Sequence, residues 1–255
     1  MIIFIALGAL IATVLGGLFA IRLRDKLHLI LGFSAGAVIA VAFFDLLPES
    51  LDLGSSFYSN STLITVTAVG FLIYLILDRL VFLHAHAHDT DVEHDEGGHG
   101  EHDHVIENRI ENKRGILGAG SLSIHSFLDG IAIGLAFQVS SAVGIIVTIA
   151  VLTHDFSDSI NTVNMILKNG GTRPKAFSWL MVDAIAPVLG IIVTLFFTVH
   201  AQNLALIIAL FAGFFLYIGA SDLIPESHHA HPKFLTTAMT VIGAGVLYVA
   251  IHLIG

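Results

Sequence analysis

Two short polar inserts within apolar sequence decide what kind of protein this chain is. Residues 125–129 read HSFLD and residues 154–158 read HDFSD, so the pattern His-x-Phe-x-Asp occurs twice. In a helix, residues i and i+4 lie on one face, and the histidine of each insert therefore lies over its aspartate. Apolar runs adjoin both inserts, at residues 131–137 and 143–152. We therefore predict two membrane-spanning helices that carry ionisable groups near the middle of the bilayer.

Such groups need partners, because a charged side chain at the centre of a spanning helix costs about 3 kcal/mol or more. Imidazole and carboxylate groups from two facing helices form a nitrogen and oxygen cage that suits a divalent transition metal. The alternative is a structural His–Asp hydrogen bond in each helix, and we favour the metal site over it because two matching pairs occur. The predicted metal ligands are His125, Asp129, His154 and Asp158.

The composition indicates an integral membrane protein, whose partner is the lipid bilayer. Of the 255 residues, 55% are hydrophobic and 12% are charged, and the mean hydropathy is +0.87. Soluble domains have about 25% charged residues. Cysteine is absent, so disulfides and thiolate ligands are excluded. The eleven Lys and Arg residues form no basic cluster that could neutralise a run of phosphates, so we expect no nucleic-acid partner.

A spanning helix needs about 20 apolar residues, and we predict an all-α membrane protein with eight such helices. Three lie within residues 1–83, two form a metal-site core at 115–168, and three lie within 169–255. Their expected bounds are 1–21, 28–51, 62–83, 115–137, 141–167, 175–199, 203–226 and 234–254.

The basic residues predict how the chain is oriented. All eleven lie in or beside connections on one side of the membrane, whereas the connections at 52–61, 138–141 and 200–202 contain none. By the positive-inside rule, both termini lie outside the cytoplasm, in a multi-pass protein of the plasma or inner membrane. Residues 1–21 lack a basic n-region and are followed by basic residues, so we interpret them as a span and not as a signal peptide.

Residues 84–114 form the one sizeable polar segment, which we expect on the cytoplasmic side. The segment holds nine of the twenty acidic residues and almost no apolar ones, so we expect it to be disordered. Histidine-rich tracts bind zinc or nickel weakly, and we interpret this one as a metal buffer or sensor; the alternative is a solvated linker. Its histidines are His84, His86, His88, His94, His99, His102 and His104.

A second repeat relates the second and seventh expected helices. Residues 45–50 read DLLPES and residues 222–227 read DLIPES. The two helices run in opposite directions, so one copy lies near the outer surface and the other near the inner surface. This is typical of inverted-topology repeats in transporters, here the first three and last three helices around the central pair. The expected access path for a metal comprises Asp45, Glu49, Glu226, His228, His229 and His231.

Together these features resemble the ZRT/IRT-like (ZIP) divalent metal transporters, in a divergent bacterial-type form. Family members carry His-Asn-x-Pro-Glu-Gly in the fourth helix and His/Gln-Glu/Asp-x-Pro-Glu-Gly in the fifth, where this chain has HSFLDG at 125–130 and HDFSDS at 154–159. The resemblance implies uptake of zinc or a related ion into the cytoplasm, an eight-helix fold with the fourth and fifth helices at its centre, and a homodimer. It also adds Asp155 to the metal ligands.

The chain departs from the family pattern at several places. Leu128 and Ser157 replace both prolines, and both glutamates are shortened to aspartate. Ala186 stands where members often have a glutamate before the proline of the sixth helix. A second, bridged metal would therefore lose ligands. The residues nearest to that secondary metal site are Ser126, Asp183, Ser221 and Asp222.

We predict a transporter, not an enzyme, that moves zinc into the cytoplasm by alternating access through the His/Asp site. Without sulfur ligands, manganese, iron, cobalt and cadmium remain possible substrates. A metal exporter and a metal-sensing relative that does not transport remain alternatives, because topology alone does not set direction. An intramembrane metalloprotease would need His-Glu-x-x-His, which the sequence lacks. A haem-binding electron carrier would need paired histidines, which His125 and His154 could supply.

Overall fold

The computed structural model describes residues 2–19, 27–86, 101–228 and 234–254, and all regular structure within these ranges is helical. Two segments are π-helical, η2 (Ala42–Leu46) and η3 (Ile218–Leu223). The α-helices are α1 (Ile2–Phe19), α2 (Leu27–Val41), α3 (Leu47–Gly54), α4 (Asn60–His86), α5 (Glu101–Val139), α6 (Ser141–Lys168), α7 (Arg173–Thr194), α8 (Ala201–Tyr217), α9 (Ile224–His228) and α10 (Phe234–Ile254).

Seven stretches within the described residues are long and apolar enough to cross a membrane, which confirms a multi-pass helical protein. α1 is apolar and packs against α6 and α7, but it is not among the seven, so the eighth span remains a prediction. The seven are His28–Gly54, Asn60–Arg79, Gly115–Val139, Ser141–Leu167, Arg173–Thr194, Ala201–Ser221 and Phe234–Leu253.

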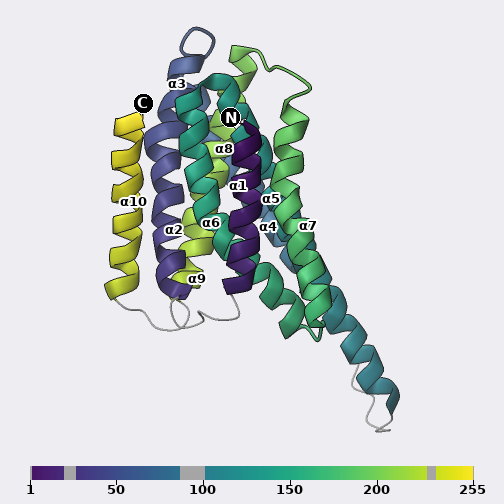
Figure 1. The fold of residues 1–255 in the computed structure, drawn as a ribbon. Coiled ribbons are helices and arrows are strands. Elements are labelled where there is room, and N and C mark those ends of the chain that lie inside the picture. Colours follow the sequence, from purple (N-terminus) through teal and green to yellow (C-terminus); the bar gives the residue numbers. More distant parts are fainter. Residues whose placement is uncertain (1, 20–26, 87–100, 229–233, 255) are drawn as a thin grey trace.

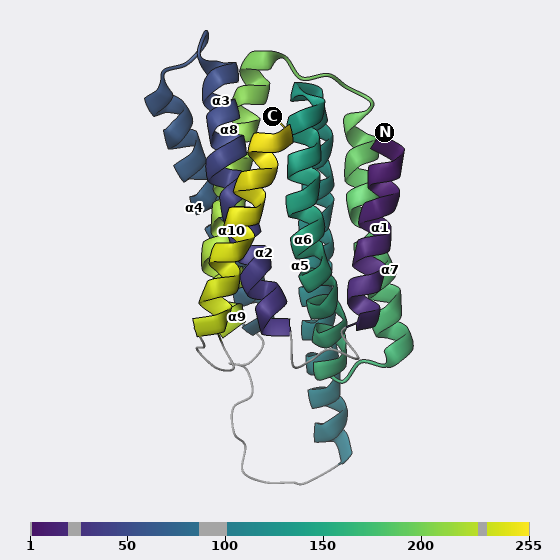
Figure 2. The same cartoon turned by 60° about the vertical axis from the view of Figure 1, so that its left-hand side comes forward.

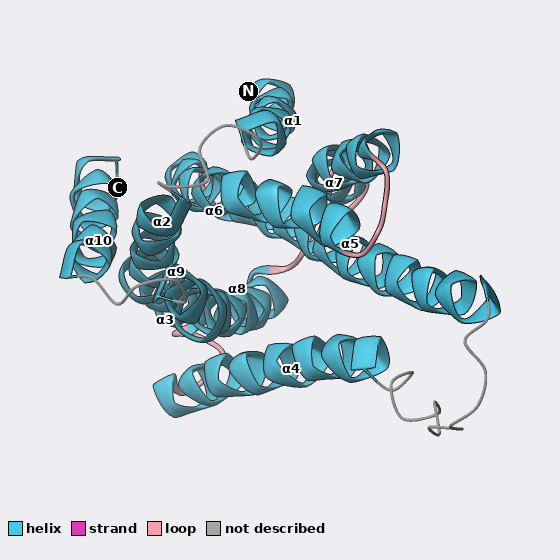
Figure 3. Ribbon diagram, turned by 90° about the horizontal axis from the view of Figure 1, so that it is seen from below, coloured by secondary structure: helices cyan, strands magenta, loops and turns pink. Residues whose placement is uncertain are grey.

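The helices pack in two groups (Figures 1 and 2). In one group, α6 and α7 pack against both α1 and α5. In the other, α2 packs against α10, and α8 packs against α3 and α4. Viewed along the bundle, α6 lies between α1 and α2 and joins the groups, whereas α4 lies at the edge (Figure 3). The main apolar core includes Val38 of α2, Ile133 of α5, Val147 of α6 and Phe215 of α8, so it holds the two groups together.

Glycines allow the helices to cross closely beside the polar inserts. A Cβ at Gly130 of α5 would collide with the backbone of Pro187 in α7, and a Cβ at Gly190 of α7 would collide with the carbonyl oxygen of Phe127. Small residues at such crossings let two backbones make direct contact within a membrane. Gly130 directly follows Asp129, so the α5–α7 crossing lies beside the first polar insert and fixes its position along the bundle axis.

Each copy of the repeated hexapeptide begins in a π-helical segment and continues into a short α-helix. η2 contains Asp45 and leads into α3, and η3 contains Asp222 and leads into α9. The proline of each copy lacks an N–H for the helical ladder, which favours a local change of helix type before it. α3 lies at one end of the bundle and α9 at the opposite end (Figure 1), as expected for antiparallel copies.

The expected end of the sixth helix is wrong. α7 ends at Thr194 and not near residue 199. The Gln138 amide donates to the carbonyl oxygens of Thr194 (3.1 Å) and Phe197 (2.9 Å) and accepts from the Val199 amide (2.9 Å), so a side chain of α5 satisfies the end of α7.

The polar segment 84–114 is helical at both ends, because α4 continues to His86 and α5 begins at Glu101. Helix-favouring Glu, Lys and Arg residues lie directly before the span of α5 and extend it. Residues 87–100 lie outside the described ranges, so the expected disorder there is untested. Both termini lie at the end of the bundle opposite the projecting start of α5 (Figure 2).

Candidate metal centre

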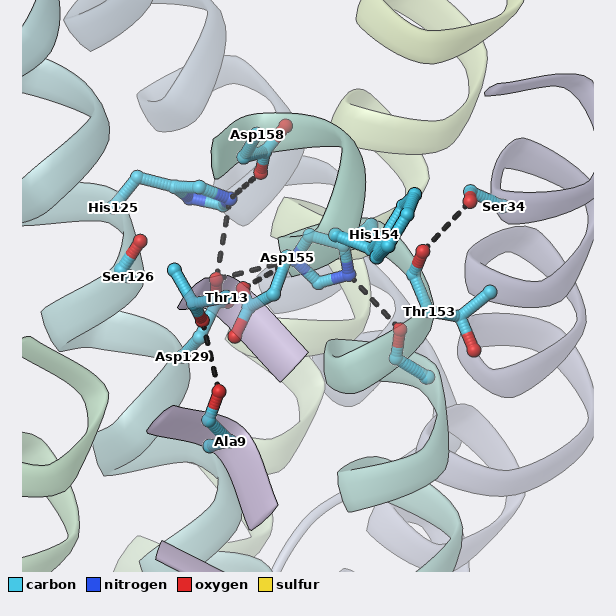
Figure 4. A network of polar contacts seen from close by, with 12 residues as sticks. Ala9, Thr13, Ser34, His125, Ser126, Asp129, Thr153, His154, Asp155 and Asp158 are labelled. Atoms are coloured by element: carbon cyan, nitrogen blue, oxygen red, sulfur yellow. Dashed lines mark hydrogen bonds and ion pairs between the residues drawn. The ribbon is translucent and has the colours of Figure 1, made fainter. Parts of the chain in front are cut away.

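The two polar inserts face each other in the middle of α5 and α6. Ser140 alone separates these helices and accepts a hydrogen bond from the Val143 amide (3.2 Å), which begins α6. Because the connection is so short, the two helices are antiparallel neighbours. The two inserts lie at similar distances along the chain from this connection and therefore face each other. The predicted ligands are all buried, with between 0% and 8% of each residue exposed (Figure 4): His125, Asp129, His154, Asp155 and Asp158.

The carboxylates and imidazoles contact each other across the two helices. Oδ2 of Asp129 lies 3.2 Å from Nε2 of His125 and 3.1 Å from Nε2 of His154. The nearest partner of Asp158 is Nε2 of His125 in the other helix, at 3.4 Å, and not the histidine one turn before it. Oδ1 of Asp155 lies 3.9 Å from Nε2 of His154. Helical spacing predicted the His125–Asp129 contact, but it missed the contact between helices made by Asp158.

Two groups of ligand atoms are compact enough to hold a metal ion. In each group the atoms lie within 4.8 Å of one another, and His154 belongs to both. Imidazole nitrogen with carboxylate oxygen is a donor set that suits zinc and other divalent first-row metals. The groups are His125 with Asp129 and His154, and His154 with Asp155 and Asp158.

The hydrogen bonds of His154 define its ligand atom. Its Nδ1 donates to the carbonyl oxygen of Ala150 (3.0 Å), an atom that can only accept. Its Nε2 therefore points at Asp129, and a proton is required in that contact because both atoms would otherwise be acceptors. A divalent ion bound to these two atoms would take the place of that proton.

The cluster has a surplus of negative charge. Both carboxylate oxygens of Asp155 are buried and, among the described residues, make no hydrogen bond. Residues 115–167 contain no Lys or Arg, so in these parts of α5 and α6 the two histidines are the basic side chains beside three aspartates. Unpaired buried carboxylates are costly unless a cation or a proton neutralises them, so the arrangement favours binding of a divalent cation.

Asp183 joins three helices beside the cluster. It is fully buried in α7, and it accepts hydrogen bonds from Ser126 of α5 (2.8 Å) and Thr162 of α6 (3.1 Å). Two of the secondary metal residues, Ser126 and Asp183, are therefore brought together, with their polar groups already paired. Of the other two, Ser221 is exposed on η3, and the side chain of Asp222 lies outside the described residues.

The predicted access path is described only in part. Asp45 is 7% exposed and its Oδ2 makes no hydrogen bond with any described group, whereas Glu49 is half-buried. At the other end, the side chains of Glu226 and His228, and all of His229 and His231, lie outside the described residues. The same holds for every histidine side chain of segment 84–114.

Sequence reasoning missed Tyr74 and Thr162. The hydroxyl of Tyr74, on α4, lies 2.7 Å from Nδ1 of His125, and Thr162 binds Asp183. A tyrosine in the middle of an apolar span is a signal that could have identified Tyr74 as a partner for a buried polar group.

A family model described as "ZIP Zinc transporter" matches residues 83–250. Zinc transporter ZIP6 of Homo sapiens is 30% identical over 143 residues, which cover 52% of this chain but 18% of ZIP6. Zinc transporter ZupT of Corynebacterium aurimucosum is 25% identical over 255 residues, covering 95% of this chain and 93% of ZupT. Zinc transporter YKE4 of Saccharomyces cerevisiae is 25% identical over 230 residues, covering 82% and 63%. The chain thus spans less than a fifth of ZIP6 and nearly all of ZupT.

Proposed function

The chain belongs to the ZIP zinc transporter family, and from that premise we propose that it carries a divalent metal ion, most readily zinc, across the membrane into the cytoplasm. The family is one of transporters and not of enzymes. The observation that carries the proposal is the buried cluster of two histidines and three aspartates between α5 and α6.

Zinc fits this cluster better than metals that prefer oxygen alone. Nε2 of both histidines faces the carboxylates, so one ion can bind imidazole nitrogen and carboxylate oxygen together. Manganese, iron, cobalt and cadmium accept similar donor sets and remain candidate substrates. Sulfur ligands play no part, because the chain has no cysteine.

The proposed path runs from Asp45 on η2 to the cluster and then to Asp222 and Glu226 at the opposite end of the bundle. The buried, unpaired Oδ2 of Asp45 supports a role for this residue in removing water from an arriving ion. The histidines of segment 84–114 would receive the ion or sense it on the cytoplasmic side.

Alternating access would occur between the two helix groups. α1 and α7 pack with α5 and α6. The packing therefore favours movement of these two helix groups over movement of two outer repeats around a central pair. Two hydrogen bonds between the groups lie beside the ligands and would break as the groups move: Tyr74 with His125 (2.7 Å), and the Ser34 hydroxyl to the Thr153 carbonyl (2.8 Å).

An inverted repeat is consistent with the helix crossings. In such a repeat, α2 corresponds to α8 and α4 corresponds to α10. The pair α2–α10 therefore corresponds to the pair α8–α4. Both pairs cross at two glycines whose Cβ positions would collide with the opposite backbone, which supports the repeat: Gly36 and Gly243 in the first pair, and Gly70 and Gly213 in the second.

The test is metal accumulation in cells that express the chain, with zinc supplied outside. We expect the wild type to accumulate zinc, and the variant Asp129→Asn with Asp158→Asn to lose accumulation at equal protein level. Asp52→Asn, which changes an exposed carboxylate, is the matched control. Loss of metal from cells would identify an exporter. Zinc binding without any flux would identify a sensor.

We also propose an orientation, a membrane and an oligomeric state for the chain. Both termini lie outside the cytoplasm, because all basic residues fall in or beside connections on the other side. The protein lies in the plasma or inner membrane as a homodimer. Accessibility labelling of the two ends in intact cells, and crosslinking in the membrane, test these assignments.

A further inference from the structure

A tyrosine outside the α5–α6 pair contacts one of the two histidines. The hydroxyl oxygen of Tyr74, on α4, lies 2.7 Å from Nδ1 of His125, and the two rings meet edge to face with centroids 5.8 Å apart. α4 otherwise packs mainly on α8 and makes few contacts with α5. The hydrogen bond is therefore a specific link from a peripheral helix to the cluster.

The Tyr74 ring is held by aromatic neighbours on α8. Its centroid lies 5.3 Å from Phe214 and 5.3 Å from Tyr217, and both of these residues are buried. Aromatic contacts of this kind contribute about 0.5–1.5 kcal/mol beyond burial of their area. The hydroxyl of Tyr74 is thus presented to His125 from a fixed position.

The two histidines are oriented by different means. Nδ1 of His154 donates to the carbonyl oxygen of Ala150, one turn earlier in the same helix. Nδ1 of His125 has the Tyr74 hydroxyl as its partner. In each case Nε2 is left facing Asp129, at 3.1 Å and 3.2 Å. An ion on Nε2 requires the ring proton on Nδ1, and a tyrosine oxygen can accept a hydrogen bond from that proton.

We infer that Tyr74 is a positioning residue at the metal site. Tyr74 holds His125 with Nε2 toward the carboxylates, and the site therefore favours metals that prefer nitrogen ligands. The inference rests on the proposed function, because it assumes that the cluster binds the transported ion. A partner on the second ring nitrogen fixes both the tautomer and the ring orientation of a metal-binding histidine. Without the hydroxyl, the ring of His125 would turn more freely, and the carboxylates would dominate the site.

The test compares Tyr74→Phe with the wild type by calorimetric titration of the purified full chain with zinc and with manganese. The variant keeps the ring and removes one oxygen. Zinc affinity is expected to fall about 10–100-fold, as for other partners of metal-binding histidines, and manganese affinity is expected to fall several-fold less, because manganese prefers carboxylate oxygen. Tyr248→Phe is the matched control, because it removes a hydroxyl from a half-exposed tyrosine on α10 whose ring also lies beside a histidine. It should bind both metals as the wild type does.

His125→Ala separates failure of this inference from failure of the proposed function. The part of the zinc isotherm lost in this variant is the share that depends on His125. No loss either in this variant or in His154→Ala, which removes the histidine common to both groups of ligand atoms, would refute the proposed site itself. If His125→Ala weakens zinc binding while Tyr74→Phe leaves it unchanged, or lowers zinc and manganese affinity equally, the role of Tyr74 is refuted and the transport site stands.

Nitrogen NMR of the unaltered, zinc-loaded chain tests the same point without relying on a folded Tyr74 variant. The resonances of His125, assigned by their loss in His125→Ala, should report a protonated Nδ1 and a metal-bound Nε2. Metal bound at Nδ1 would overturn the inference.

Discussion

Binding of a divalent ion at the His/Asp cluster is expected to release protons, and the hydrogen bonds indicate how many. Nδ1 of His154 must carry a proton, because its partner is the carbonyl oxygen of Ala150. A second proton must lie between Nε2 of His154 and Oδ2 of Asp129, which are 3.1 Å apart. An ion that binds both of these atoms displaces the second proton, so the minimum is one proton per ion.

His125 sets the upper limit on the number of protons released per ion. Its Nε2 faces Oδ2 of Asp129 at 3.2 Å and Oδ2 of Asp158 at 3.4 Å, so Nε2 donates in these contacts. When an ion takes Nε2, this proton moves to Nδ1, beside the Tyr74 oxygen, if Nδ1 is unprotonated, and it leaves the protein if Nδ1 already carries a proton. The total is therefore about one to two protons per ion. Affinity should then fall by about one to two decades for each pH unit of acidification while these protons remain bound.

Calorimetric titration with zinc in two buffers of different protonation enthalpy measures the number of protons released, with His154→Ala subtracted to isolate the cluster. Zinc affinity should weaken as the pH is lowered from about 7 to about 5.5, since imidazole must be neutral to bind metal. His252→Ala, which removes an exposed histidine of α10, should leave the number unchanged. A value of zero, or an affinity that does not depend on pH, would refute the hydrogen-bond assignment.

Three further substitutions test the packing and charge around the cluster. Gly130→Ala should lower the free energy of unfolding by about 1–3 kcal/mol, because the new Cβ meets the α7 backbone. The control Gly245→Ala, whose Cβ meets nothing within 4 Å, should be neutral or slightly stabilising. Equal melting temperatures for the two variants would contradict the expected clash at Gly130. Asp155→Asn should weaken zinc binding without lowering the melting temperature, because the carboxylate has no hydrogen-bond partner among the described residues to lose; a marked loss of stability would instead indicate a structural role. Asp183→Ala should cost about 1–3 kcal/mol, because the buried hydroxyl of Thr162 loses its acceptor, whereas that of Ser126 keeps the carbonyl oxygen of Leu122 at 3.1 Å. Thermal unfolding that matches the wild type would show that these bonds contribute little.

The sequence carried enough information to predict the membrane spans and the family, and the family match confirms the latter. Long apolar runs and their length requirement depend on local composition, so seven of the eight expected spans are recovered within the described residues. The end of α7 was missed because Gln138 of α5, a residue far away in sequence, satisfies the carbonyl group of its last residue, Thr194, and that of Phe197 just beyond it. A contact of that kind depends on the tertiary packing and has no signature in the helix that it ends.

The residue types at the cluster were predictable, but their contacts were not. Helical spacing states which side chains share a face, so it placed His125 over Asp129. It does not state how two helices are rotated relative to each other, and for that reason the contact between Asp158 and His125 emerged only from the fold. Tyr74 was missed for the same reason, because nothing in the sequence of α4 indicates which neighbour its hydroxyl meets.

X-ray absorption at the zinc edge of the purified, zinc-loaded chain tests whether the cluster holds the ion, with the His154→Ala spectrum subtracted to remove zinc held by other histidines. We expect two imidazole nitrogens at about 2.0–2.1 Å together with carboxylate oxygen in the first coordination shell. A shell made of oxygen alone, or a spectrum that His154→Ala leaves unchanged, would show that the buried histidines and aspartates of α5 and α6 do not hold the transported ion.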